Sequence, residues 1–167
     1  TQLAKAMASL RSGELVMDIG RTPAVLRAVG APDLTLRISR DTIRKATNGV
    51  KHDVPMEVIE QLPELLHDPV AVFGSKTTSD ALTALIDAND RSGRPVMVAV
   101  HMNANTGRTT VNLVASSYGR PESQFNAWVH DGLLLYAKTG GRRRRQQHGL
   151  SGRLLDPRQS HITGRLL

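Results

Sequence analysis

The chain has 167 residues and a mass of 18.2 kDa, which suits one compact domain with a core of its own. It contains no cysteine, and this excludes disulfides, thiolate nucleophiles and cysteine zinc sites. No apolar run approaches the roughly 18 residues of a membrane helix, so we expect no membrane partner.

The net charge of +7 is concentrated at one end of the chain. Residues 1–140 carry 15 Lys and Arg against 14 Asp and Glu, whereas residues 141–167 carry 7 Arg against 1 Asp. The nearly neutral body therefore has to be judged by local patches rather than by its net charge. Four consecutive arginines, Arg142 to Arg145, could hold phosphates by charge alone, but a solvated chain end is the simpler interpretation.

This distribution predicts three segments. Residues 1–13 are an N-terminal segment or linker, residues 14–140 are the folded domain, and residues 141–167 are a basic, disordered tail. Because the chain begins with Thr1 rather than Met, we expect it to be a piece of a longer protein. Its first five residues lack the apolar stretch of a secretory signal peptide.

Short helices and strands alternate in the first half of the body. The predicted elements are a helix over 3–10, a strand over 15–19, a helix that follows Thr22–Pro23 and ends at Gly30, a strand over 34–38, and a helix that Ser39 caps and Asn48–Gly49 ends. Asp53 is expected to cap the next helix, and Pro63 to kink or restart it. The apolar stripe of that helix is formed by Met56, Ile59, Leu62 and Leu66.

The second half is rich in predicted strands. They cover residues 69–74, 81–88, 95–102, 109–115 and 133–137, with a turn at 89–93, a hairpin turn at 103–107 and a helix over 123–130. Residues 81–88 also fit a helix, but pairing with the next run favours a strand. Residues 116–121 are expected to leave the sheet, and Trp128 to pack in the core. This order predicts an α+β domain whose N-terminal helices pack on a mostly antiparallel sheet.

The most suggestive cluster for chemistry brings three cations and one imidazole into nine residues: Arg44, Lys45, Lys51 and His52. A histidine can take the 2′-hydroxyl proton of RNA near neutral pH, and Lys and Arg can stabilise the charge that grows on the phosphate. The simpler alternative is a solvated helix end, where cations are favoured by the helix dipole.

Ser116, Tyr118 and Arg120 form a second cluster at the end of a predicted strand. Hydroxyl groups at the rim of a sheet can contact phosphate and base, although serine and glycine could simply end the strand and Tyr118 could pack on the next helix. Three further residues are candidate substrate contacts: His101, Asn103 and Lys138. For His101 a partly buried structural role is the alternative, and for Lys138 a solvated one.

No sharp catalytic signature is present. The sequence lacks a phosphate-binding glycine loop and the HExxH and GxSxG motifs. Its six histidines are not spaced as metal ligands, so we expect no metal and no cofactor.

Several ordered blocks of the body resemble one known family, the C-terminal domain found on phage MuF-type proteins. The blocks are Ile19–Pro23, Leu34–Ile38, Arg44–Pro55, Leu65–Phe73, Gly93–Val96, Val100–Asn103, Ala115–Arg120 and Trp128 with Asp131–Leu134. The resemblance covers roughly residues 14–138 and lies in the order of the blocks rather than in one short motif.

This resemblance implies a place among the barnase–EndoU–colicin–RelE-like nucleases, a metal-independent ribonuclease fold with helices on an antiparallel sheet. Such domains are toxin tips of phage, prophage or secreted polymorphic proteins, often beside an immunity protein. By the same resemblance, His52 corresponds to the helix-associated histidine of such sites and Ser116 with Tyr118 to the polar pair at a strand end. Lys45, Lys51 and Arg120 correspond to cations that face the phosphate.

The resulting hypothesis is a bacterial or phage-encoded endoribonuclease toxin that acts in the bacterial cytoplasm. His52, Lys51, Ser116 and Tyr118 are its expected catalytic residues. RNA, with tRNA as one candidate, is the expected substrate, and an immunity protein the expected partner. Two alternatives stay open: a non-catalytic module that binds nucleic acid or protein, and an ADP-ribosyltransferase-like toxin that would use Glu122.

Overall fold

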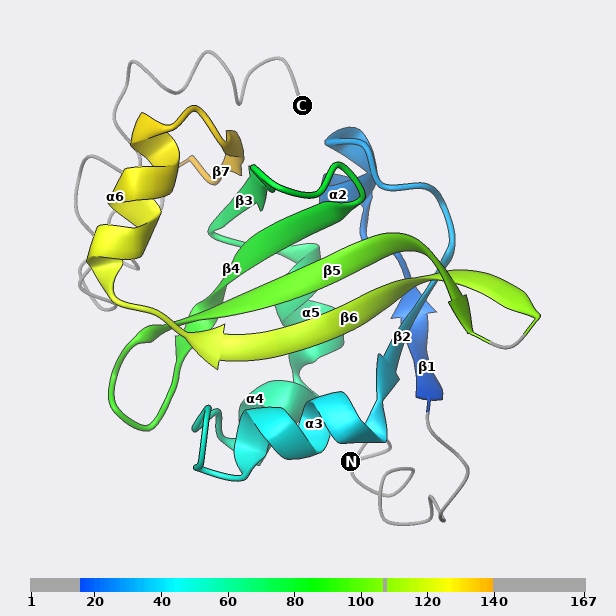
Figure 1. Cartoon of the computed structure of the whole chain (residues 1–167), viewed down its shortest axis with the longest axis horizontal. Coiled ribbons are helices and arrows are strands. Elements are labelled where there is room, and N and C mark those ends of the chain that lie inside the picture. The colour runs from blue at the N-terminus through cyan, green and yellow to red at the C-terminus, as the bar shows by residue number, and fades with distance from the viewer. Residues whose placement is uncertain (1–15, 107, 140–167) are drawn as a thin grey trace.

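The computed structural model describes residues 16–106 and 108–139, which form a seven-stranded sheet in the order β1-β2-β6-β5-β4-β3-β7 (Figure 1). The strands are β1 (Val16–Arg21), β2 (Thr35–Ser39), β3 (Ala71–Gly74), β4 (Ala81–Asn89), β5 (Pro95–Thr106), β6 (Thr109–Gly119) and β7 (Leu134–Ala137). The helices of this part of the chain are α2 (Ala24–Ala28), α3 (Arg40–Thr47), α4 (Met56–Glu60), α5 (Leu62–His67) and α6 (Glu122–His130).

All neighbouring strands in this sheet are antiparallel except β2 and β6, which pair in parallel. That pair joins the N-terminal hairpin of β1 and β2 to the long β5–β6 hairpin. The buried side chain of Asn112 strengthens the junction, because its Nδ2 donates to Thr22 Oγ1 at 2.7 Å and to the Pro32 carbonyl oxygen at 2.9 Å. Its own Oδ1 accepts the backbone N–H of Asn103 at 3.3 Å.

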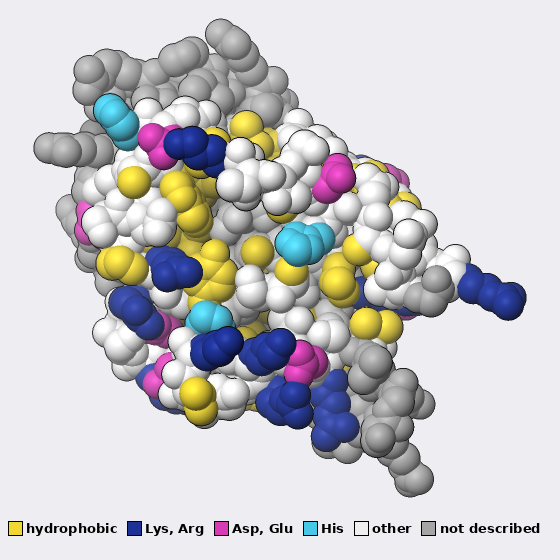
Figure 2. Space-filling view, viewed as in Figure 1, with side chains coloured by type: hydrophobic (Ala, Val, Ile, Leu, Met, Phe, Trp, Pro, Cys, Tyr) yellow, Lys and Arg dark blue, Asp and Glu magenta, His cyan; other side chains and the backbone are white. Residues whose placement is uncertain are grey.

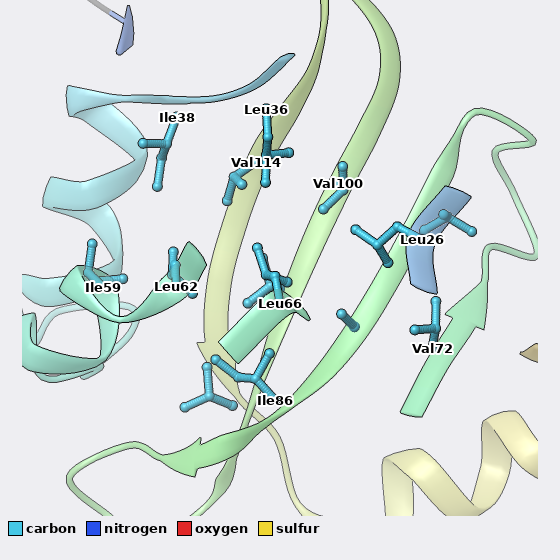
Figure 3. Close-up of a cluster of buried hydrophobic side chains, with 14 of the residues drawn as sticks. Leu26, Leu36, Ile38, Ile59, Leu62, Leu66, Val72, Ile86, Val100 and Val114 are labelled. Carbon is cyan, nitrogen blue, oxygen red and sulfur yellow. The ribbon is translucent and has the colours of Figure 1, made fainter. Parts of the chain in front are cut away.

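Each face of the sheet carries a separate hydrophobic core. On one face, helices α2 to α5 cover β3 to β6, and the core side chains include Leu26, Ile59, Leu66, Val100 and Val114 (Figure 3). Figure 1 shows α5 behind the sheet. On the other face, α6 covers a smaller core that contains Phe73, Leu85, Met97 and Phe125. Because successive strand residues point to opposite faces, Phe73 and its neighbour Val72 belong to different cores.

Most predicted elements are confirmed. Ser39 caps α3, since its side chain accepts the backbone N–H of Thr42, and the helix ends before Asn48. Residues 81–88 lie in a strand, and β3 is buried throughout Ala71–Phe73. Pro63 falls in the first turn of α5, so the predicted long helix restarts as two short ones. The stripe of Ile59, Leu62 and Leu66 is buried, and Met56 packs against it.

Three local predictions are wrong. β6 continues to Gly119, so residues 116–119 stay in the sheet, because their backbone pairs with Val96–Ala99 of β5. The predicted hairpin turn at 103–107 is mostly strand, since β5 reaches Thr106 and Asn105 pairs with Thr110. Asp53 does not cap α4, because its carboxylate binds Arg91 instead.

The α+β class and the mostly antiparallel sheet are confirmed, and the helix predicted over 123–130 is α6, which follows β6. The helix expected over 3–10, the segment 1–13 and the basic tail 141–167 lie outside the described residues. None of the helices in the described part is long and apolar enough to cross a membrane.

The buried stripe makes a first prediction. Leu66→Ala removes a fully buried side chain from the core beneath the sheet, so we expect the free energy of unfolding to fall by about 2–5 kcal/mol. Glu64→Ala, at an exposed position of the same helix, is the control and should change it by less than about 0.5 kcal/mol. Urea unfolding followed by circular dichroism measures both, and equal losses would contradict this assignment of the core.

Candidate functional site

Three segments that are distant in sequence meet at one corner of the sheet. They are the loop after α3 (48–55), the turn between β4 and β5 (90–94) and the end of β6 (116–120). Arg91 joins the first two, since its backbone N–H donates to the Asp53 carbonyl oxygen at 3.0 Å and its Nη1 donates to Asp53 Oδ1 at 2.6 Å. The N–H of Arg120 donates to the Pro95 carbonyl oxygen at 3.0 Å, which places the end of β6 beside the same turn.

The loop after α3 is a closed structure that presents His52. Gly49 has a positive φ of 77°, which glycine adopts without strain, and its N–H donates to the His52 carbonyl oxygen. The N–H of Val54 donates back to the carbonyl oxygen of Ala46 in α3, and Val54 itself is buried. The Asn48–Gly49 pair therefore reverses the chain, and His52 lies half-buried next to the sheet.

His52, Tyr118 and Arg120 form a stack. The ring centroids of His52 and Tyr118 are 5.5 Å apart and the rings are tilted by 33°. The guanidinium carbon of Arg120 lies 4.7 Å from the centroid of the Tyr118 ring, which is a cation–π contact. The contact between His52 and Tyr118 brings residues of the two predicted clusters side by side.

The surroundings of His52 favour its neutral form. Partial burial lowers the pKa of His52 below its ordinary value, and the positive charges of Arg120, Lys51 and Arg94 lower it further. A backbone hydrogen bond at Lys51 opposes this shift of the pKa only in part. No acidic residue of the described chain is among the charges that act on this pKa. The result is an imidazole that can accept a proton near neutral pH, in a place that attracts anions.

Ser116 and Tyr118 share the open part of the sheet face on which α6 packs. A bulge in β6 adds one residue opposite the step from Ala99 to Val100, so Ser116 pairs with Ala99 and Tyr118 with Met97. Ser116, Ala99 and Thr83 form a half-buried row across three strands. In Figure 2, Lys and Arg side chains gather around a histidine on this side of the molecule, near α3 and the end of β6.

His101 lies on the same face, one row further from α6, where it pairs with Ala81 and Leu113. It is exposed, so the alternative of a partly buried structural histidine is wrong. Asn103 is also exposed and has a φ of 56° at a second bulge, in β5. Both residues lie along the strand, away from His52, rather than in the stack itself.

Three predicted cations have other partners. Arg44 and Lys45 both bind Asp41 on the exposed side of α3, and these ion pairs lower the pKa of Asp41. Lys138 binds Asp68 at 2.5 Å, beside the edge strand β7 and across the sheet from β6. The structure therefore does not bring Lys138 to the His52 corner, whereas Lys51 and Arg120 act on His52 directly.

The sequence interpretation gave no site role to Asp90, which it placed in a turn, or to Arg94, which it named only within the block Gly93–Val96. Asp90 is buried, and its Oδ1 accepts the N–H and hydroxyl of Ser92 and the N–H of Arg94 at 2.8–3.0 Å. Its Oδ2 accepts Nε of Arg94 at 3.1 Å. Burial alone would raise the pKa of Asp90, but these bonds from Arg94 and Ser92 outweigh it and the pKa is lowered. The sequence did contain a signal for Asp90, because an aspartate two residues before a serine in a turn is typical of a carboxylate that accepts backbone N–H groups.

Gly119 allows β6 to pack closely against the turn that holds Asp90 and Arg94. A Cβ atom at this position would lie 2.1 Å from Asp90 Oδ2 and 3.2 Å from the Cβ of Arg94. Only glycine therefore lets the end of β6 approach the buried carboxylate. Ser117 is also buried on β6, on the same face as Gly119 and opposite to Tyr118, and its hydroxyl has no hydrogen-bond partner among the described residues.

No group of three His, Asp or Glu side chains within 16–106 and 108–139 is arranged to hold a metal ion. That the reaction needs no metal ion stays a prediction, because it concerns catalysis rather than the arrangement of these side chains.

The fold and the site together define an α+β domain with a histidine among cations at the end of an open sheet face. A family model described as the phage MuF C-terminal domain matches residues 44–143, and the chain belongs to this family. The resemblance inferred from the sequence blocks is thereby confirmed, although the matched segment begins within α3 rather than near residue 14. No curated protein and no solved structure matches the chain.

Gly119→Ala tests the close approach of β6 to the turn. The added methyl group would have to displace a carboxylate held by four hydrogen bonds, so we expect a loss of about 1–3 kcal/mol in the free energy of unfolding. Gly74→Ala is the matched control, because the nearest atom to its Cβ would be Leu135 Cδ1, at an ordinary contact distance of 3.5 Å. Unfolding curves that coincide for the two variants would contradict the steric argument.

Arg120→Gln tests the electrostatics of His52. Removing a positive neighbour makes protonation of the imidazole less costly, so the pKa of His52 should rise toward the ordinary value for histidine. Titration of the histidine ring protons by NMR measures this pKa. Lys76→Gln removes an equal charge beside Asp131 and should leave the titration unchanged. An unchanged or lower pKa in Arg120→Gln would rule out this role of Arg120.

Proposed function

We propose that the domain is a metal-independent endoribonuclease that cleaves RNA by attack of the 2′-hydroxyl on the adjacent phosphodiester. The observation that carries the proposal is the stack of His52, Tyr118 and Arg120 at the end of an open sheet face. A histidine whose pKa is lowered by burial and by cations suits proton abstraction from a 2′-hydroxyl. The same cations suit an anionic phosphate.

In the proposed reaction His52 takes the proton of the 2′-hydroxyl while the 2′ oxygen forms a bond to phosphorus. The bond from phosphorus to the 5′ oxygen breaks, and this oxygen leaves with a proton from a second group. Tyr118, whose ring contacts His52, is the candidate donor. The products are a 2′,3′-cyclic phosphate and a free 5′-hydroxyl, so atoms and charge balance without water or a cofactor.

The remaining residues of the site have binding roles in this proposal. Lys51 and Arg120 neutralise the charge that develops on the phosphate in the transition state, a function that a metal ion serves in other nucleases. Ser116 lies on the same sheet face as Tyr118 and orients the bound phosphate or ribose. His101 and Asn103, further along β5, contact the neighbouring nucleotides.

Membership of the family supports the proposed role, target and partner of the domain. As a phage MuF C-terminal domain, the chain would act as a toxin on RNA in the bacterial cytoplasm, with tRNA as one candidate target and an immunity protein as its partner. These roles come from the resemblance and are independent of the geometry of the site.

Cleavage of total bacterial RNA in the presence of EDTA tests the proposal. Wild type should cleave, and His52→Ala should lose at least 100-fold in rate, because general-base catalysis is worth on the order of 10²–10⁴-fold. His67→Ala is the matched control, since this exposed histidine ends α5 on the opposite face of the sheet. Cyclic phosphate ends, detected by their resistance to a phosphatase, identify the reaction.

The other outcomes separate the alternatives. Equal cleavage by wild type and His52→Ala would keep the nuclease and remove His52 from the catalytic site. No cleavage by folded wild type would favour a binding module or a nucleotide-transfer toxin. For the latter, Glu122 is the first residue of α6 and lies two positions after Arg120. Transfer of labelled ADP-ribose from NAD would then replace RNA as the assay.

A further inference from the structure

The buried carboxylate of Asp90 sets the orientation of the Arg94 side chain. Asp90 binds its Nε, its backbone N–H and the rest of the turn, so the start of the guanidinium group is fixed relative to β5. The hydrogen bond and ion pair to Asp90 use Nε of Arg94, and the two terminal nitrogens form no ion pair with a described residue. The side chain is 45% exposed whereas that of Asp90 is fully buried, so these nitrogens face outward.

The same arginine lies at the His52 corner. Arg91, three residues earlier, holds Asp53 by its backbone and its side chain, and Asp53 follows His52 directly. On the other side, Pro95 accepts the N–H of Arg120, so Arg94 and Arg120 flank neighbouring strand ends. Gly119 packs directly on the Asp90–Arg94 pair. Three independent contacts thus place Arg94 beside the stack of His52, Tyr118 and Arg120.

We propose that Arg94, oriented by Asp90, binds the scissile phosphate of the RNA through its two terminal nitrogens, an inference that rests on the proposed nuclease function. A guanidinium group held at Nε presents two parallel N–H donors, the geometry that matches two phosphate oxygens. Arg94 and Arg120 then hold the phosphate from two strand ends while His52 takes the proton. Asp90 acts as a positioning residue and does not touch the substrate.

Steady-state cleavage of a short RNA measures the contribution of Arg94. Arg94→Gln should lower kcat/KM on the order of 100-fold, comparable to the loss of one oriented transition-state donor. Arg94→Lys keeps the charge but not the two parallel donors, so it should recover only a small part. Arg21→Gln is the matched control, because Arg21 is also an exposed arginine bound to an aspartate, Asp33, but lies on β1 near the other end of the sheet.

Asp90→Asn separates positioning from general stability. Asn retains an oxygen that can accept the N–H groups of the turn, but it loses the charge that holds Nε of Arg94. We expect a loss of about 10-fold in kcat/KM, and the double variant with Arg94→Gln should be no worse than Arg94→Gln alone. Additive losses would show that Asp90 does not act through Arg94 and would overturn the positioning role.

A binding measurement keeps this inference distinct from the nuclease proposal. A 2′-deoxy oligonucleotide cannot be cleaved by this route, and its binding should shift the His52 ring signals in NMR spectra. The shift should saturate at the same oligonucleotide concentration in wild type and in Arg21→Gln. In Arg94→Gln, saturation should require at least 10-fold more oligonucleotide.

If wild type binds in this way but does not cleave RNA, the phosphate site stands and the nuclease proposal fails. If Arg94→Gln matches wild type in binding and in cleavage, the inference about Arg94 fails alone. Arg94→Lys with full activity would equally overturn the claim that two oriented donors are required.

Discussion

One extra residue in β6 decides which side chains reach the open face of the sheet. Side chains alternate along a strand, so without the bulge at Ala115 the residues Ser116 and Tyr118 would share the core face of Val114. The bulge reverses the alternation and turns Tyr118 toward His52, while Ser117 is buried and its hydroxyl has no hydrogen-bond partner in the part of the chain that the structure describes. The stack and every role proposed for it depend on this change of register.

The corner beside this strand end combines one buried carboxylate, that of Asp90, with several cations. The buried carboxylate of Asp90 accepts four hydrogen bonds, all from Ser92 and Arg94 of its own turn. It therefore orients Arg94, whereas Arg120 and Lys51 are not bound by this carboxylate. Burial and the positive charges of Arg120, Lys51 and Arg94 lower the pKa of His52, and the binding of an anion would raise it again.

Patterns of local sequence were enough to predict most helices and strands of this domain. Caps such as Ser39, the apolar stripe of Ile59 and Leu66, and the unbroken apolar run of β3 predicted their elements because short-range physics sets them. The candidate site was predicted in part: His52, Tyr118 and Arg120 meet, but Lys138 does not join them. Bulges and the contact between Asp90 and Gly119 arise from pairing across strands, which no single stretch of sequence displays.

The parallel pairing of β2 with β6 has a consequence for where the folding unit begins. The family match starts at residue 44, yet β6 finds its outer partner at Leu36–Ile38, and Asn112 is satisfied only by Thr22 and Pro32 on that side. A fragment cut to the matched residues would leave the backbone of β6 open along one side and an amide buried without acceptors. Such an exposed edge invites pairing with other chains, so the shorter fragment would tend to aggregate rather than stay monomeric.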